Sequence, residues 1–249
     1  MVFKIKADER LYESSAPAWL FNEHKERYNF ALELLKGKKV LDVACGSGYG
    51  SKILSELNDV VGMDISAEAI DYANKRYKNK KCKFIQGDAE DLPFPNSSFD
   101  AVVSFETIEH LENPIKFIKE IERILKDKGI FIVSTPNKEI FSPLCREPLI
   151  SHHVKEFRIN ELTALFKTSK IKLYGQHFVN STILPANAII NLCFMPFRVF
   201  KFMKDINRMF ITLSNKFYYS FEKKGVDEIK NKGGLPSVFI LLGQNKKDE

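Results

Sequence analysis

The stretch VLDVACGSGYG, residues 40–50, decides the fold of this chain. It opens with a short apolar run that contains one acid, Asp42, and such a run is typical of a buried strand. Glycines follow directly, at Gly46 and Gly48, where they allow the backbone to turn and to approach a ligand closely. Because ligands of open α/β sheets bind beyond the carboxyl ends of the strands, we expect a binding site at this turn.

Strand-like and helix-like patterns alternate along most of the chain. This alternation predicts βαβ units on a parallel sheet, and therefore an α/β fold. The expected strands span residues 40–44, 59–64, 83–86, 99–104, 130–134, 171–175 and 237–242. The expected helices end near residues 35, 57, 77 and 125, and a further helix begins near residue 160.

The patterns divide the chain into four parts. We expect residues 1–37 to form an N-terminal helical cap or lid and residues 38–179 to form the α/β core. Residues 180–234 are expected to be a helical insertion, and residues 235–249 the last core strand and a tail. The insertion is far longer than a usual connection between two strands, so it should have structure of its own.

Within the insertion, apolar residues recur every three or four positions between basic ones, over residues 197–217. This basic amphipathic pattern fits a lid, part of an acceptor pocket, or a dimer surface. It also fits an interfacial helix that contacts lipid head groups or a lipid-linked acceptor. The segment is too short and too polar to span a membrane, and the sequence leaves the oligomeric state open.

Composition excludes several classes of partner. With 38 basic and 32 acidic residues the net charge is only +6, and no RNA-binding module is visible, so nucleic acid is not an expected partner. Four cysteines without a CxxC pair and an N-terminus without an apolar leader indicate reduced thiols and a cytoplasmic location. No cluster of histidines and acids has metal-site spacing, so no metal is expected.

The residues around the glycine turn indicate the chemistry of the ligand. Asp64 follows at the end of the second expected strand, where an acid can accept both hydroxyls of a ribose. The glycines read GxGxG, not the GxGxxG of a dinucleotide site, and a carboxylate at Asp42 is unfavourable beside a pyrophosphate. It is favourable beside an α-ammonium group, which indicates a nucleoside with an amino-acid tail.

These segments resemble class I S-adenosylmethionine-dependent methyltransferases, of the type 11-like group, over residues 38–137. VLDVACGSGYG is followed, in order and at the family's spacing, by VVGMDIS and FIQGDAEDLPFPNSSFDAVVSFETIEHLENP. The resemblance implies a Rossmann-like seven-stranded sheet, with the last strand antiparallel and helices on its flanks. It also implies S-adenosylmethionine as the cofactor and S-adenosylhomocysteine as its product.

The same resemblance implies a set of cofactor contacts. It places Asp42 at the amino group of the cofactor, Gly46 and Gly48 beside its methionine part, Asp64 at the ribose hydroxyls, Ile65 and Ala89 against adenine, Asp88 at the adenine amino group, and Phe105 at the methionine end. Arg27 and Tyr28 could close over the cofactor as a lid, or could simply pack the first helix.

The flanking segments resemble methyltransferases that act on sugars and surface glycans. The leader contains EHKERY, residues 23–28, and STPN and HHVKEF follow at 134–137 and 152–157. The preferred acceptor is therefore a hydroxyl or amine of a nucleotide-sugar or surface-glycan precursor. The alternatives are a lipid-like or quinone-type acceptor, and a SAM-binding regulatory or scaffold protein without turnover; a dehydrogenase-like protein is disfavoured by the GxGxG spacing.

Three side chains are candidates for the catalytic step. His153, His110 and Glu106 all follow expected strands at the open edge of the sheet, where they could contact the acceptor. Each of them could instead have a structural role. For His153 that role would be to tie its loop to the next helix. Glu156 is interpreted as a solvated loop charge.

Overall fold

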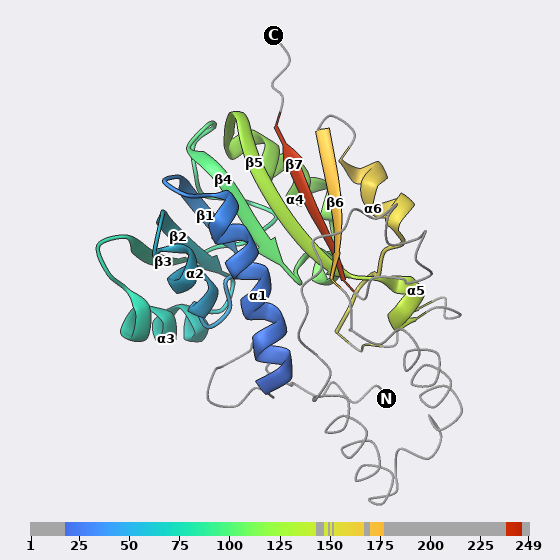
Figure 1. Cartoon of the computed structure of the whole chain (residues 1–249), viewed down its shortest axis with the longest axis horizontal. Helices are drawn as coiled ribbons and strands as arrows, with labels where there is room; N and C mark the ends of the chain where they lie inside the picture. Colours follow the sequence, from blue (N-terminus) through green and yellow to red (C-terminus); the bar gives the residue numbers. More distant parts are fainter. Residues whose placement is uncertain are drawn as a thin grey trace, which may run out of the picture.

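The computed structural model describes residues 18–142, 147–148, 150, 152–166, 170–176 and 238–245. Seven strands form one sheet in the order β3-β2-β1-β4-β5-β7-β6 (Figure 1). They are β1 (Lys39–Val43), β2 (Asp59–Asp64), β3 (Cys82–Gln86), β4 (Phe99–Phe105), β5 (Leu125–Pro136), β6 (Lys170–Gln176) and β7 (Val238–Gln244). The helices are α1 (Ala18–Leu34), α2 (Tyr49–Leu54), α3 (Ala67–Tyr77), the short 3₁₀ helix η1 (Ile108–His110), α4 (Pro114–Ile124), α5 (Lys138–Phe141) and α6 (Ile159–Leu165).

Strand direction confirms the expected mixed α/β sheet. Strands β1 to β5 pair in parallel, whereas β7 is antiparallel to both β5 and β6. The chain runs outward from β1 through β2 to β3 and then returns to pair β4 on the other side of β1. Such a reversal separates the connections that leave β1 and β4, and it opens a crevice at their carboxyl ends.

Helices cover both faces of the sheet, and each face has its own hydrophobic cluster. On one face, residues of α1, α2 and α3 pack against the sheet, including Leu35 directly after α1, Leu54 and Ala73. On the other face, α4 and α6 bury Phe117, Ile121, Leu162 and their neighbours. The result is a three-layer α/β/α arrangement with the parallel strands buried between helices.

Local capping explains why the helices begin where the sequence predicts. The hydroxyl oxygen of Ser66 accepts a hydrogen bond from the backbone N–H of Ala69 at 3.2 Å and so starts α3. Asn113 caps α4 in the same way, with Pro114 at the first helical position. Two details differ from expectation: α2 ends at Leu54, before residue 57, and the four-residue α5 had no recognised signal.

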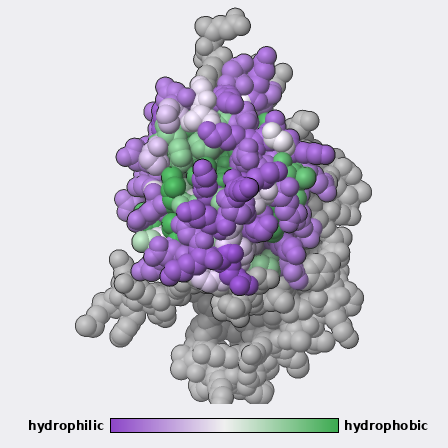
Figure 2. Space-filling view, turned by 90° about the vertical axis from the view of Figure 1, so that its left-hand side faces the viewer, coloured by the Kyte–Doolittle hydropathy of each residue, from purple (hydrophilic) through white to green (hydrophobic). Residues whose placement is uncertain are grey.

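Several predictions fall on residues outside the described ranges. The insertion at 180–234, with its lid, acceptor-pocket, dimer-surface and lipid-contact alternatives, is among them, as is most of the N-terminal part before α1. Among the described helices, none combines the length and the apolar composition needed to cross a bilayer. On the face shown in Figure 2, hydrophilic residues cover most of the described surface around smaller hydrophobic patches.

A glycine in β7 makes room for the packing of β5. Gly243 stands directly across from Phe131 in the antiparallel ladder, and the Phe131 ring is buried and stacked on Phe166 with 4.9 Å between ring centroids. A Cβ atom at Gly243 would lie 1.9 Å from Cζ of Phe131, so either the ring or the strand would have to move.

We therefore expect Gly243→Ala to lower the free energy of unfolding by about 1–3 kcal/mol, the usual cost of overpacking a core. Denaturant unfolding followed by circular dichroism measures the change. Adding Phe131→Leu to Gly243→Ala should restore part of the loss, because the smaller side chain leaves room for the new methyl group. An unchanged unfolding midpoint for the single variant would contradict this packing.

Candidate functional site

A cavity of about 520 Å³ lies at the carboxyl ends of β1, β2 and β4, within the usual range for ligand pockets. The loops after the first four strands line it with residues 44–47, 63–65, 87–89 and 105–107. The remaining lining side chains are His24, Tyr28, Tyr49, His110, Leu111 and His152. The site therefore lies where the strand order reverses, as the sequence predicts.

Backbone conformation at this edge is unusual. Ala44 and Glu106, the residues directly after β1 and β4, have φ values of 58° and 50°, a region that side-chain-bearing residues rarely occupy. Gly46 and Gly48 also have positive φ values, of 54° and 85°. Strained residues of this kind cluster at binding and active sites, where the surrounding structure holds them in place.

Gly46 and Gly48 have different surroundings. Gly46 lines the cavity, whereas Gly48 does not. A Cβ atom on Gly48 would come within 2.6 Å of the Ala73 Cβ and 2.8 Å of the Phe84 ring, so this glycine lets the turn pack against α3 and β3. The structure thus gives Gly48 a role in the turn rather than in the wall of the cavity.

Asp64 connects two of the loops that line the cavity. One carboxylate oxygen accepts a hydrogen bond from the backbone N–H of Gly46 and the other from that of Ser66, each at 2.9 Å. The next residue, Ile65, is 64% exposed, which is high for a large aliphatic side chain in a cavity wall. An acidic group therefore stands beside an uncovered apolar surface. Asp88 and Ala89, from the loop after β3, line the same cavity.

Asp42 lies below the cavity rather than in its wall. It sits inside β1, fully buried, and its side chain accepts hydrogen bonds from Ser51 at 2.6 Å and from Tyr28 at 3.3 Å. Tyr28 lines the cavity and Asp42 does not, although the sequence places Asp42 at the cofactor's amino group. Burial raises the pKa of Asp42 to about 7; the two hydrogen bonds oppose this and the nearby Asp64 adds to it.

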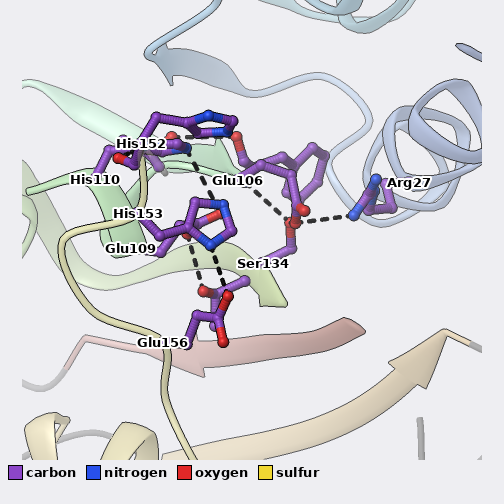
Figure 3. Close-up of polar contacts among 11 residues, drawn as sticks. Arg27, Glu106, Glu109, His110, Ser134, His152, His153 and Glu156 are labelled. Carbon is purple, nitrogen blue, oxygen red and sulfur yellow. Dashed lines mark hydrogen bonds and ion pairs between the residues drawn. The ribbon is translucent and has the colours of Figure 1, made fainter. Parts of the chain in front are cut away.

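An ion pair holds α1 against the end of β4. Arg27 is only 1% exposed, and its guanidinium lies 2.9 Å from a carboxylate oxygen of Glu106 (Figure 3). The hydroxyl of Ser134 donates to the same oxygen at 2.8 Å. Glu106 and Phe105 line the cavity, but Arg27 does not, so Arg27 acts on the cavity through Glu106.

The histidines are arranged differently from the sequence-based expectation. His110 lines the cavity together with His152, whereas His153 does not. The Nδ1 atom of His153 lies 3.0 Å from a carboxylate oxygen of Glu156, and both side chains are almost completely buried. The sequence does not indicate that His152 belongs to the site. It lies 42 residues from His110, and only the fold brings the two side chains together.

The interpretation of Glu156 as a solvated loop charge is wrong. Its side chain is buried, and the burial by itself would raise the pKa of the carboxyl. Hydrogen bonds from His153 and Ser142 outweigh that effect and hold the pKa below its usual value. Glu156 is therefore a buried anion paired with His153, a feature that no local sequence signal distinguishes from a surface acid.

The central part of the chain is similar in sequence to known proteins. Residues 41–133 match the family model of a methyltransferase domain. A Mycolicibacterium smegmatis protein named "Probable S-adenosylmethionine-dependent methyltransferase" is 35% identical over 150 residues, which are 60% of this chain and 58% of that protein. The fatty-acid O-methyltransferase of the same organism is 31% identical over 49% of each chain. The chain thus spans about half the length of these curated relatives.

A solved structure extends the comparison to the fold. The [4+2]-cyclase SpnF superposes with a TM-score of 0.61 at 17% identity, covering 96% of this chain and 86% of that one. This fold therefore also serves a protein named for another reaction, so the reaction has to be argued from the site. The printed name of the Mycolicibacterium smegmatis methyltransferase gives S-adenosylmethionine as the cofactor of that protein.

The residues of the cavity fit this cofactor. Asp64 brings a carboxylate that can accept from hydroxyl groups, and the uncovered Ile65 side chain offers an apolar surface for a flat ring. Gly46 presents backbone without a side chain at the same wall. The opposite end is polar, with Glu106, His110 and His152. A nucleoside with an amino-acid-like tail fits these groups, because it brings hydroxyls, a flat ring and a charged end to one cavity.

The raised pKa of Asp42 has a consequence for stability. In the unfolded chain the carboxyl ionises near its ordinary pKa of 3.8, but in the folded protein it does so near 7. Between these values the folded state binds the extra proton, so this group's contribution to stability falls as pH rises and levels off above pH 7. The loss amounts to about 4 kcal/mol, since one pKa unit corresponds to about 1.4 kcal/mol.

We expect Asp42→Asn to remove this pH dependence. The stability of the variant relative to the parent should increase between about pH 4 and pH 7 and stay constant above, because an amide does not ionise. Urea unfolding of both proteins across that range measures the difference. A parallel shift of both curves, with a difference that does not depend on pH, would show that Asp42 ionises normally in the folded protein.

Proposed function

We propose that this protein transfers a methyl group from S-adenosylmethionine to an oxygen or nitrogen nucleophile of a small molecule. The observation that carries the proposal is one cavity with Asp64 and Ile65 at one end and Glu106, His110 and His152 at the other. Bound S-adenosylmethionine supplies an electrophilic methyl group on a sulfonium centre. The cavity then has room for a cofactor at the first end and an acceptor at the second.

The first end binds the cofactor through its nucleoside. We assign to Asp64 the ribose hydroxyls, because its carboxylate lines the cavity at the end of β2 and a carboxylate accepts hydrogen bonds from hydroxyl groups. Ile65 and Ala89 pack on the adenine ring, and Asp88 accepts from its amino group. The two backbone N–H contacts to Asp64 fix the carboxylate before the cofactor arrives, which lowers the entropic cost of binding.

The second end orients the acceptor. Glu106 is fixed by Arg27 and Ser134, so its carboxylate offers a rigid hydrogen-bond acceptor for a hydroxyl or an amine. Alignment of two reactants can contribute about 7–11 kcal/mol to the lowering of a barrier. Removal of the acceptor's proton by a nearby side chain contributes about 10²–10⁴-fold when the acceptor is a hydroxyl.

Two acceptor classes remain in the proposal. The polar end of the cavity and the STPN and HHVKEF segments support a sugar hydroxyl or amine, on a nucleotide-sugar or surface-glycan precursor. The name of the fatty-acid O-methyltransferase among the relatives supports a lipid-like acceptor. The difference is testable, because the two classes partition between water and organic solvent.

We expect methyl-tritiated S-adenosylmethionine to label an extract of the source cell when the purified full chain is added. Label in water-soluble sugar species supports the glycan acceptor, and label in the organic phase supports the lipid acceptor. Binding of the cofactor without labelled product in either phase would overturn methyl transfer and leave a SAM-binding protein without turnover. An Asp64→Ala sample run in parallel measures labelling that does not depend on the enzyme.

Asp64→Ala should weaken S-adenosylmethionine binding by about 10–100-fold, because each hydrogen bond to a charged group contributes about 1.5–3 kcal/mol. Isothermal titration calorimetry measures the dissociation constant. Asp71→Ala is the matched control, since Asp71 is an exposed acid on α3 and should leave the affinity unchanged. An unchanged dissociation constant for Asp64→Ala would refute the ribose assignment.

A further inference from the structure

Three histidines from two distant parts of the chain meet at the polar end of the cavity (Figure 3). His110 ends η1, directly after β4, while His152 and His153 belong to the segment between α5 and α6. The three rings stand 5.0–5.3 Å apart, centroid to centroid, and one nitrogen from each lies within 4.8 Å of the others. His153 is buried and His152 is exposed.

Backbone hydrogen bonds hold these two parts together. The N–H groups of Val154 and Lys155 both donate to the carbonyl oxygen of Glu109, at 2.8 and 3.0 Å. Farther along the segment, the N–H of Lys138 donates to the carbonyl of Phe157 at 3.1 Å. The backbone that follows His152 and His153 is therefore tied both to η1 and to the start of α5, and a functional cluster needs such contacts if its geometry is to be fixed in advance.

Hydrogen bonds also select the tautomers of two of the rings. Nδ1 of His110 lies 3.2 Å from the carbonyl oxygen of His152, and Nδ1 of His153 lies 3.0 Å from a carboxylate oxygen of Glu156. Because both partners only accept, each Nδ1 carries the proton, and Nε2 is the unprotonated nitrogen of the neutral ring. A carboxylate or carbonyl behind an imidazole is the usual support of a metal-binding histidine.

A buried carboxylate beside the rings gives an independent indication. Glu109 is fully buried, and Thr135 donates to one of its oxygens at 2.9 Å. The other oxygen accepts no hydrogen bond and lies 3.9 Å from Nε2 of His110. Leaving a buried carboxylate oxygen without a donor costs free energy. A cation among the histidines would interact favourably with that oxygen and so compensate for the cost.

We propose that His110, His152 and His153 bind a divalent transition-metal ion of the zinc type, with the buried carboxyl group of Glu109 beside it. Imidazole nitrogens favour zinc and related first-row ions over magnesium or calcium. A nitrogen about 2.1 Å from zinc puts its ring centre about 3.2 Å away, so three rings in a tetrahedral arrangement stand about 5 Å apart. The observed centroid separations are close to that value, and the three nitrogens, which lie within 4.8 Å of one another, would move together to about 3.4 Å as the metal binds.

The fourth coordination position would face the cavity, because His110 and His152 line it. Three protein ligands with one open position are typical of catalytic rather than structural zinc sites. A water molecule or an oxygen of the acceptor could occupy that position. The use of the metal in the reaction rests on the proposed methyl transfer, whereas metal binding itself does not.

Isothermal titration of the full chain, without a histidine tag and freed of metal by chelation, with Zn²⁺ alone tests the site. We expect a single equivalent of Zn²⁺ to bind, and His152→Ala to weaken its affinity at least about 100-fold, since even the loss of a supporting residue typically costs 10–100-fold. His152 is exposed, so this variant should fold, and circular dichroism verifies that it does. Glu156→Gln should weaken binding by a smaller factor, because the amide supports the His153 ring less strongly.

His24→Ala is the matched control, since His24 lines the same cavity outside the cluster and should leave Zn²⁺ affinity unchanged. Failure of the parent chain to bind Zn²⁺, or equal binding by the parent and His152→Ala, would overturn the metal site. Measurement of S-adenosylmethionine binding on the same samples separates the two proposals. If the chain binds the cofactor but no Zn²⁺, only the metal-site proposal is refuted. If it binds Zn²⁺ but transfers no methyl group, only the proposed function is refuted.

Discussion

Two backbone N–H groups converge on the carboxylate of Asp64, and most of the cavity depends on this interaction. One comes from the glycine turn after β1 and the other from the start of α3, so a single side chain sets the distance between two loops. The parallel pairing of β1 with β2 brings the loops to the same edge of the sheet, and the carboxylate then fixes their separation. Ile65 is left uncovered beside it.

The other end of the cavity depends on buried charge. Arg27 and Glu106 form an ion pair between α1 and the end of β4, and the carboxylate of Glu156 is buried against His153. Charged groups in a protein interior are costly unless they are paired, and their pairing restricts the geometry of everything attached to them. Burying these polar groups costs stability, but it fixes their arrangement. Such an arrangement is typical of a binding or catalytic site.

Periodicity predicted the elements well, because the signals are local. Ser66 and Asn113 cap helices through contacts three residues away, and buried parallel strands are short apolar runs wherever they occur. Side-chain direction was harder to predict. Asp42 occupies the motif position that suggests a cofactor contact, yet inside β1 its side chain faces the layer of α1 and α2, where Tyr28 and Ser51 enclose it.

The sequence by itself determined the α/β fold, the glycine turn at the end of β1 and the match of residues 41–133 to a methyltransferase domain model, since each rests on residues close together in the chain. Only the tertiary structure decided the polar end of the site. His110 and His152 are 42 residues apart, and Arg27 and Glu106 are 79 apart, so no local pattern records that they meet. The strand order places β5 beside β4 and so brings the segments of His110 and His152, which follow these strands, to one edge of the sheet. Arg27 reaches Glu106 because α1 packs on the same sheet.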